Sequence, residues 1–147
     1  MRAVVTRVAH ASVTIDEKIN GQIGRGFLVL LGVGPNDTSE TAAKLAEKIC
    51  NLRIFEDENG KMNLNLEQVG GSLLVGSQFT LYADTSSRRP GFTGAAKPDK
   101  AIPLYEEFMA HCRARGFTVE HGEFGADMKV DSLNDGPVTI LFDTERP

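Results

Sequence analysis

A continuous apolar run is the feature that most constrains the fold of this 147-residue chain. Residues 26–33 read Gly-Phe-Leu-Val-Leu-Leu-Gly-Val, without a single polar side chain. A short apolar run of this kind, ended by the turn-forming residues 34–37, is typical of a strand that is buried on both faces. The run therefore predicts an interior β-strand, around which the remaining segments must be arranged.

The residues before this run predict two further strands. Residues 1–8 and 11–15 mix β-branched and polar side chains with partial alternation. The hairpin turn after them has two candidates, Asp16-Glu17 and Asn20-Gly21. Asn-Gly is the stronger turn signal, whereas Asp16-Glu17 gives strands of better matched length, so both positions stay open.

Two later segments have helical spacing. The first helix is expected after Asp37 or Thr38, either of which can cap it. Its buried face would be formed by Ala42, Leu45, Ala46 and Ile49. The second helix is expected to start between Asp99 and Pro103, because proline is tolerated only in the first turn, and to stop near Gly116. Its apolar positions are Ile102, Tyr105, Met109 and Cys112.

The other segments predict short strands and one long loop. Strands are expected at residues 53–55, within 73–82, and in several pieces between 117 and 142, where glycines and the segment 134–137 interrupt the pattern. Residues 83–97 form an irregular loop, and long loops in compact domains are often functional. The sum is a single α+β domain over residues 1–147: a mostly antiparallel, barrel-like sheet with two flanking helices.

Charge and residue counts exclude several classes of protein. The net charge of −4 and the pI near 5.4 argue against non-specific coating of nucleic acid, which needs many cationic side chains. The two cysteines, Cys50 and Cys112, have neither disulfide-scaffold nor zinc-site spacing, and no histidine stands at metal-ligand spacing. No apolar run approaches the length of a membrane span, and no secretory signal is visible. We therefore expect a cytoplasmic protein without membrane attachment, metal or cofactor.

Two segments carry residues suited to chemistry. Ser77-Gln-Phe-Thr-Leu-Tyr82 ends an apolar strand at the mouth of the long loop. In an ideal strand Gln78 and Thr80 share one face, and the end of the strand offers hydroxyl, amide and backbone N–H groups that suit an oxyanion-type site. The segment 134–139, Asn-Asp-Gly-Pro-Val-Thr, is first a turn signal, and its Gly136-Pro137 bond is a candidate for the cis form. From the residues alone, a plain strand end and a plain hairpin turn remain the simpler interpretations.

Together these two segments resemble the signature motifs of the D-aminoacyl-tRNA deacylases. Other stretches agree with the family in the same order along nearly the whole chain: 7–13, 28–33, 53–55, 60–65 and 126–128. The resemblance implies a homodimer without a metal that hydrolyses the ester between a D-amino acid, or mischarged glycine, and the 3′-terminal adenosine of tRNA. It further implies that the Gly136-Pro137 bond is cis and reaches into the partner subunit's site, where it rejects the side chain of an L-amino acid.

The resemblance also assigns roles to single residues. Thr80 and the backbone around Phe79 would lie beside the scissile ester, while Ser77 and Gln78 would orient the substrate or maintain the shape of the site. Gly136, Pro137, Arg7 and Met128 would contribute to substrate binding, with Arg7 bracing the Gly-Pro element. No His, Lys or carboxylate in the motif is placed to activate Thr80, so we favour assistance by the 2′-hydroxyl of the terminal ribose over a covalent threonine.

Two other functions remain open at this stage. The first is a non-catalytic nucleic-acid-binding module on the same fold, which the acidic net charge does not favour. The second is hydrolysis of small D-amino esters without tRNA. Within the long loop, residues 84–100 carry four cationic and two acidic side chains, a local charge of +2 that suits the phosphates of a tRNA acceptor end, although a solvated loop explains it equally well.

Overall fold

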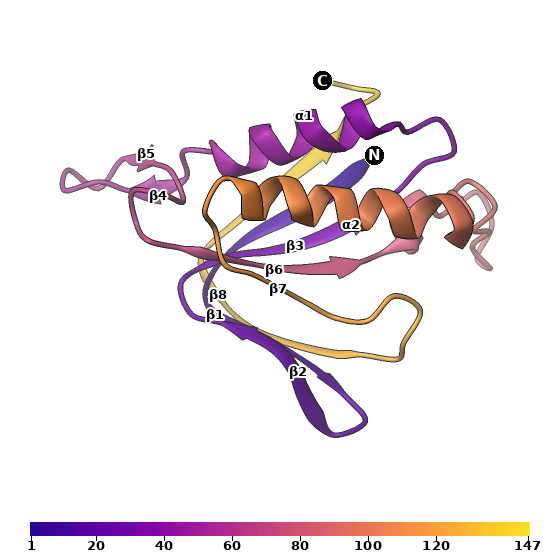
Figure 1. The fold of residues 1–147 in the computed structure, drawn as a ribbon, viewed down its shortest axis with the longest axis horizontal. Coiled ribbons are helices and arrows are strands. Elements are labelled where there is room, and N and C mark those ends of the chain that lie inside the picture. Colours follow the sequence, from indigo (N-terminus) through magenta and orange to yellow (C-terminus); the bar gives the residue numbers. More distant parts are fainter.

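The computed structural model describes residues 1–147 and shows a six-stranded main sheet with two helices (Figure 1). The main-sheet strands are β1 (Arg2–Ile15), β2 (Lys18–Ile23), β3 (Gly26–Gly32), β6 (Ser72–Ser77), β7 (Val119–His121) and β8 (Lys129–Asp143). A separate hairpin consists of β4 (Phe55–Glu56) and β5 (Met62–Leu64), and the helices are α1 (Ser39–Cys50), α2 (Pro98–Ala114) and the short 3-10 helix η1 (Phe79–Tyr82). The prediction of an α+β fold with a barrel-like sheet is confirmed.

Strand β1 organises the sheet because it is hydrogen-bonded along both edges. Its first half pairs antiparallel with β3, and its second half pairs antiparallel with β2. Strand β8 follows the other edge for nearly the whole length of β1. The β1–β2 hairpin curves away from the helices (Figure 1) until the side-chain amide of Asn20 donates a hydrogen bond of 2.7 Å to the carbonyl of His121 in β7. The sheet is thereby nearly closed into a barrel.

Strand β3 is buried on both faces, as its apolar run predicts. Phe27, Val29 and Leu31 point toward the helices and belong to the main core, whereas Leu28 belongs to a smaller core on the opposite face. This smaller core fills the curved half of the sheet with Val8, Ala11, Val13, Ile23, Leu28 and Leu74. Its position explains the curvature, because β1 and β2 must fold over these side chains to exclude water from them.

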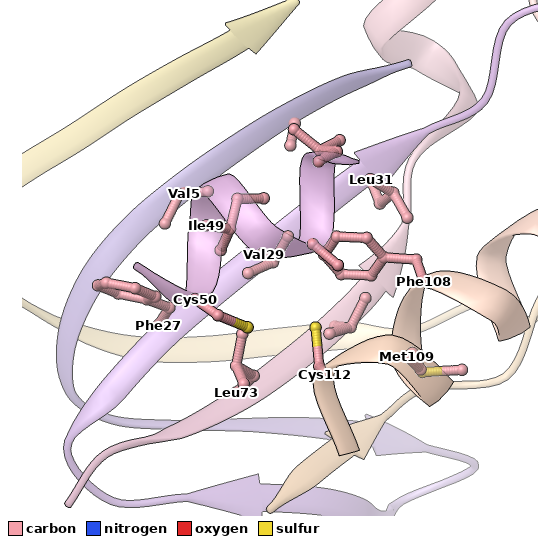
Figure 2. Packing of buried hydrophobic residues seen from close by; sticks show 14 of the residues in the cluster. Val5, Phe27, Val29, Leu31, Ile49, Cys50, Leu73, Phe108, Met109 and Cys112 are labelled. Carbon is pink, nitrogen blue, oxygen red and sulfur yellow. The ribbon is translucent and has the colours of Figure 1, made fainter. Parts of the chain in front are cut away.

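Helices α1 and α2 pack over one face of the sheet and carry the two cysteines into the main core. Figure 2 shows the sulfur atoms of Cys50 on α1 and Cys112 on α2 facing each other. Both thiols are free and buried. The hydrogen bond with Cys50 and burial together raise the pKa of the Cys112 thiol. The same contact lowers the pKa of the Cys50 thiol. Because Cys50 and Cys112 are almost fully buried inside the main core, neither sulfur can reach a substrate, and the pair is a packing contact between the helices.

Several local predictions are corrected by the structure. Of the two candidate hairpin turns, Asp16-Glu17 is the one that forms, with positive φ at both residues, as the tight two-residue hairpin turn requires. The short strand expected at residues 53–55 instead covers Phe55–Glu56. The sheet is mostly antiparallel, but β6 runs parallel to both β3 and β7.

The second helix differs from the prediction at its start. It begins at Pro98, where the missing N–H of proline costs nothing, and Pro103 lies inside the helix rather than in its first turn. The N–H that Pro103 lacks would have bonded to the carbonyl of Asp99, at the frayed beginning of the helix, so the loss is tolerated.

The largest correction concerns residues 117–142. These were expected to form several short strands, with a hairpin turn at 134–137. The structure instead has the short strand β7 (Val119–His121) and one long strand, β8, which runs from Lys129 through the expected turn to Asp143. The register of β8 against β1 shifts where Arg7 faces it. A bulge in a long edge strand replaces the hairpin turn, because β1 offers continuous hydrogen-bonding partners on both sides of the irregularity.

One buried carboxylate ties the start of the chain to the turn after β3. Asp37 is 4% exposed, and its Oδ1 accepts a hydrogen bond of 2.7 Å from the ammonium group of Met1. Its Oδ2 accepts one of 2.6 Å from the N–H of Gly34. The same ammonium group donates to Thr144 Oγ1 at 2.7 Å. Asp37 is therefore not the helix cap; that role belongs to Thr38, which forms a capping box with Thr41.

No helix in the structure is long and apolar enough to pass through a bilayer.

We predict that Asp37→Asn lowers the free energy of unfolding by about 3 kcal/mol, because it leaves the buried ammonium group of Met1 without its counter-charge. Urea denaturation followed by circular dichroism measures this change. Glu40→Gln is the control: it removes the exposed ion pair with Lys44 and should leave the denaturation midpoint almost unchanged. An equally small effect of Asp37→Asn would contradict the stabilising role of the buried pair.

Candidate active site

The segment 77–82 is not an extended strand end. Strand β6 stops at Ser77, and residues 79–82 turn into the 3-10 helix η1. Gln78 makes this transition: its N–H still donates to the Leu31 carbonyl of β3 at 2.8 Å, while its own carbonyl accepts from the N–H of Leu81 at 3.2 Å. The expected sharing of one strand face by Gln78 and Thr80 is therefore wrong, although the structure does bring their side chains together.

The start of η1 leaves two backbone donors free. In a helix the first N–H groups have no acceptor within the helix, and those of Phe79 and Thr80 find none in the surrounding loops or side chains. Beside them, the side-chain amide of Gln78 donates a hydrogen bond to Thr80 Oγ1. Two N–H groups and a hydroxyl thus lie next to one another at the end of the sheet. Such a group of donors suits a carbonyl oxygen that gains negative charge.

Thr80 has no partner that could act as a general base. The one side-chain hydrogen bond to its Oγ1 comes from an amide N–H, which can donate but not take up a proton. Tyr82 does not supply a base either, because burial and the charge of Asp37 raise the pKa of its hydroxyl. The phenol therefore stays protonated at neutral pH. The geometry favours stabilisation of charge over activation of a side-chain nucleophile.

Tyr82 holds η1 against the sheet. Arg2 lies over its ring, with Cζ 4.4 Å from the ring centroid, and donates from Nη1 to the Leu81 carbonyl at 2.8 Å. On the other side, the Tyr82 hydroxyl would be 2.7 Å from a Cβ at position 34, so only glycine fits there. The end of β3 is thus shaped to receive the aromatic ring, and this ring holds the segment 77–82 in position.

Met128 lies on the same side of the sheet as the Ser77–Gln78 segment. A small, mainly apolar pocket of about 30 Å³ is lined by Ser77, Gln78 and Met128 together with side chains of β1, β3 and β6. The structure therefore groups five of the eight predicted site residues: Ser77, Gln78, Phe79, Thr80 and Met128.

The other three predicted residues form a second group. Arg7 is buried and donates from Nε to the Asp135 carbonyl at 3.0 Å and from Nη1 to the Ile54 carbonyl at 2.6 Å. Its Nη2 would lie 2.9 Å from a Cβ at Gly136. The Gly136-Pro137 bond is cis, which confirms that prediction. Arg7 thus braces the segment 135–137, as the resemblance implies.

The two groups do not meet within one chain. The segment 135–137 faces Arg7 of β1, and Arg7 is paired with Phe27 of β3. Phe27 is paired in turn with Leu73 of β6. Ser77, at the end of β6, is paired with Leu31. The offset is therefore four residues along the strands, about 13 Å, and three strand spacings across them, about 14 Å. The Gly-Pro element of a chain is too far away to contact that chain's own Thr80.

No group of three or more His, Cys, Asp or Glu side chains is arranged to hold a metal ion.

Residues that sequence reasoning missed include Arg2, Gly34 and Tyr82, which position η1. A Gly32-x-Gly34 pair at the end of an apolar strand was a usable signal, since small residues there indicate close approach of another segment. It gave no indication of which aromatic ring would approach.

Comparison with known proteins shows which family the chain resembles along its length. The model of the family described as D-Tyr-tRNA(Tyr) deacylase matches residues 4–143. The chain is 61% identical over 141 residues to a D-aminoacyl-tRNA deacylase of Shewanella baltica (strain OS185), covering 95% of this chain and 97% of that protein.

Two solved structures share the fold. The c-Myc DNA unwinding element binding protein has a TM-score of 0.92 at 38% identity, covering 98% of this chain and 99% of the other. A probable eukaryotic D-amino acid tRNA deacylase has a TM-score of 0.83 at 19% identity, covering 96% and 97%, a likeness of fold alone. With the family model matching almost the whole chain and a curated deacylase at 61% identity, this chain belongs to the D-aminoacyl-tRNA deacylases, a family of hydrolases.

Proposed function

We propose that this enzyme hydrolyses the ester between a D-amino acid, or mischarged glycine, and the 3′-terminal adenosine of tRNA, releasing the amino acid and tRNA in the cytoplasm. The observation that carries the proposal is the pair of unbonded N–H groups of Phe79 and Thr80 at the start of η1. An ester carbonyl placed there would receive two hydrogen bonds as its oxygen becomes negative in the tetrahedral transition state. The attacking water adds to the carbonyl carbon, and the ribose oxygen leaves with a proton.

The proton transfers do not need an ionisable side chain. Thr80 Oγ1 has only the Gln78 amide as its side-chain partner, so it orients the substrate and does not attack it. The adjacent 2′-hydroxyl of the terminal ribose lies next to the scissile ester in the substrate itself and guides the proton. Fixing these groups in one geometry can replace several kcal/mol of side-chain chemistry.

A second copy of the chain completes the site. Within one copy, the Gly136–Pro137 segment and Thr80 are separated by two intervening strands, β1 and β3. Strand β8 pairs only with β1, so its outer edge is free, and Leu133 and Leu141 on it are largely exposed. A homodimer formed through this region brings the Gly-Pro backbone of one copy to the η1 segment of the other. Backbone atoms there exclude the side chain of an L-amino acid while a D-residue or glycine still fits, so specificity comes from rejection.

The alternative of a nucleic-acid-binding module has one observation in its favour, the likeness to the c-Myc DNA unwinding element binding protein. The net charge of −4 does not suit a duplex-binding face. Tight, steeply salt-dependent binding to duplex DNA in the absence of deacylation would make this the better proposal.

The direct test is release of the amino acid from D-tyrosyl-tRNA and L-tyrosyl-tRNA by purified protein. We expect hydrolysis of the D-ester with the L-ester largely spared. Equal hydrolysis of both esters, or of neither, would contradict the proposal. Including D-tyrosine methyl ester separates a deacylase from a hydrolase of small D-amino esters, which would cleave it as well as the tRNA ester.

Thr80→Ala distinguishes the two catalytic accounts. We expect kcat to fall by about tenfold or less, the equivalent of one lost hydrogen bond, because the ribose and the backbone N–H groups remain. A covalent threonine mechanism requires near-complete loss instead. Single-turnover hydrolysis of D-tyrosyl-tRNA measures the rate, and a trapped acyl-threonine would overturn the ribose-assisted account.

Arg7→Lys should lower the preference for the D-ester over the L-ester by about tenfold, because lysine cannot bond the Asp135 and Ile54 carbonyls at once and the segment 135–137 loosens. The ratio of kcat/KM for the two esters is the readout. Arg53→Lys is a matched control, since Arg53 also donates to a backbone carbonyl, that of Asn63, but in an exposed hairpin. An unchanged ratio in Arg7→Lys would show that the brace has no part in chiral selection.

A further inference from the structure

Two exposed aromatic rings lie next to each other beside the catalytic segment. Phe79, the first residue of η1, is 54% exposed, and Phe92 in the loop 83–97 is 41% exposed. Their ring centroids are 5.4 Å apart, and the rings are inclined at 77°, an edge-to-face contact. Phe79 is the neighbour of Thr80 in the chain. The pair therefore presents two exposed aromatic rings, steeply inclined to each other, immediately next to the proposed position of the ester.

The loop that carries Phe92 is held in place rather than free. Asp84 and Gly91 exchange two backbone hydrogen bonds of 2.8 and 3.0 Å, which close the loop just before Phe92. Beyond Phe92, the N–H of Ala96 donates to the Val33 carbonyl at 2.9 Å, at the end of β3. Phe92 is thus presented against Phe79 by a closed loop that is anchored on both sides.

The same loop presents positive charge. Arg88 and Arg89 are exposed at its tip, between Asp84 and Gly91, and neither belongs to an ion pair of the structure. The carboxylate nearest to them in sequence, Asp84, is turned into its own loop, where it accepts a hydrogen bond of 2.9 Å from the N–H of Ser86. Two unneutralised guanidinium groups are therefore carried by the same loop as Phe92, in a chain whose net charge is negative.

We infer that Phe79 and Phe92 form a stacking platform for the single-stranded nucleotides that precede the terminal adenosine, with Arg88 and Arg89 contacting their phosphates. The inference rests on the proposed function, because it assumes an RNA 3′ end as substrate. Exposed aromatic rings next to cationic side chains are the arrangement with which proteins bind single-stranded nucleic acid without reading its sequence. Such a platform suits an enzyme that must accept many tRNAs sharing one single-stranded end.

An apolar protein surface fits the same rings less well. An interface core formed by Phe79 and Phe92 would place Arg88 and Arg89 at its border and would need opposing carboxylates from the partner. A single strand of RNA supplies both complements at once, since each nucleotide carries a base to stack and a phosphate to pair with a guanidinium group.

The test is equilibrium binding of uncharged tRNA, measured by fluorescence anisotropy, to the full chain and to Phe92→Leu. The same tRNA without its last three nucleotides is the second probe. We expect Phe92→Leu to weaken binding of intact tRNA by about tenfold, the effect of losing one stacked base. Trimming the tRNA should weaken binding to the wild-type chain and cause little further loss in the variant, because both changes remove the same contact.

Two further variants serve as controls. Phe92→Tyr keeps the aromatic face and should bind intact tRNA as the wild-type chain does. Met62→Ala removes a comparably exposed apolar side chain from the β4–β5 hairpin, at the other end of the molecule (Figure 1), and should change nothing. Replacing Arg88 and Arg89 by Gln should reduce the slope of log K against log salt by about 1.4, or 0.7 for each phosphate contact in a single strand.

Three outcomes would overturn the inference. In the first, Phe92→Leu has no effect on tRNA binding, or it weakens the binding of intact and of trimmed tRNA equally. In the second, leucine and tyrosine at position 92 behave alike. In the third, Phe92→Leu changes the mass of the protein in solution by light scattering, which would assign the aromatic pair to contact with a second copy. If the wild-type chain shows the expected binding pattern but releases no D-amino acid, the proposed function fails and the platform stands.

Discussion

The double pairing of strand β1 is the constraint on which the rest of the structure depends. One edge of β1 pairs with β8 along almost the whole length of β1. The other edge pairs first with β3 and then with β2. A strand of this length twists, so the two halves of the sheet cannot remain in one plane, and the β1–β2 hairpin curls over the smaller core toward β7. The same pairing fixes the segment 134–137 at the edge of the sheet, opposite Arg7.

The site at the end of β6 is assembled from backbone groups more than from reactive side chains. A parallel strand ends at Ser77, and the chain turns directly into a 3-10 helix, which leaves two N–H groups without acceptors. Arg2 and Tyr82 hold that helix in position from behind. Such preorganised donors cost no rearrangement when charge develops on a substrate oxygen, and they work without an ionisable residue at the centre. This is consistent with the scarcity of histidine and metal-ligand patterns in the sequence.

The sequence predicted the elements that depend on local pattern. The apolar run of β3, the periodic face of α1 and the irregular loop 83–97 all appear where they were expected. Predictions failed where a partner strand outweighed a local signal. Asn134 to Pro137 read as a hairpin turn, yet β1 holds this stretch within a continuous edge strand. Gln78 and Thr80 were brought together by the turn of η1 and not by the alternation of a strand.

The sequence by itself determined the fold class, the absence of metal-ligand spacing, the family resemblance and the two candidate motifs, because motifs and periodicity are local properties of the chain. Only the tertiary structure decided that the predicted site residues fall into two separate groups. It placed Ser77 to Thr80 with Met128 and, three strands away, Arg7 with Gly136 and Pro137. Strand register sets that separation, and register follows from long-range pairing that no short motif encodes.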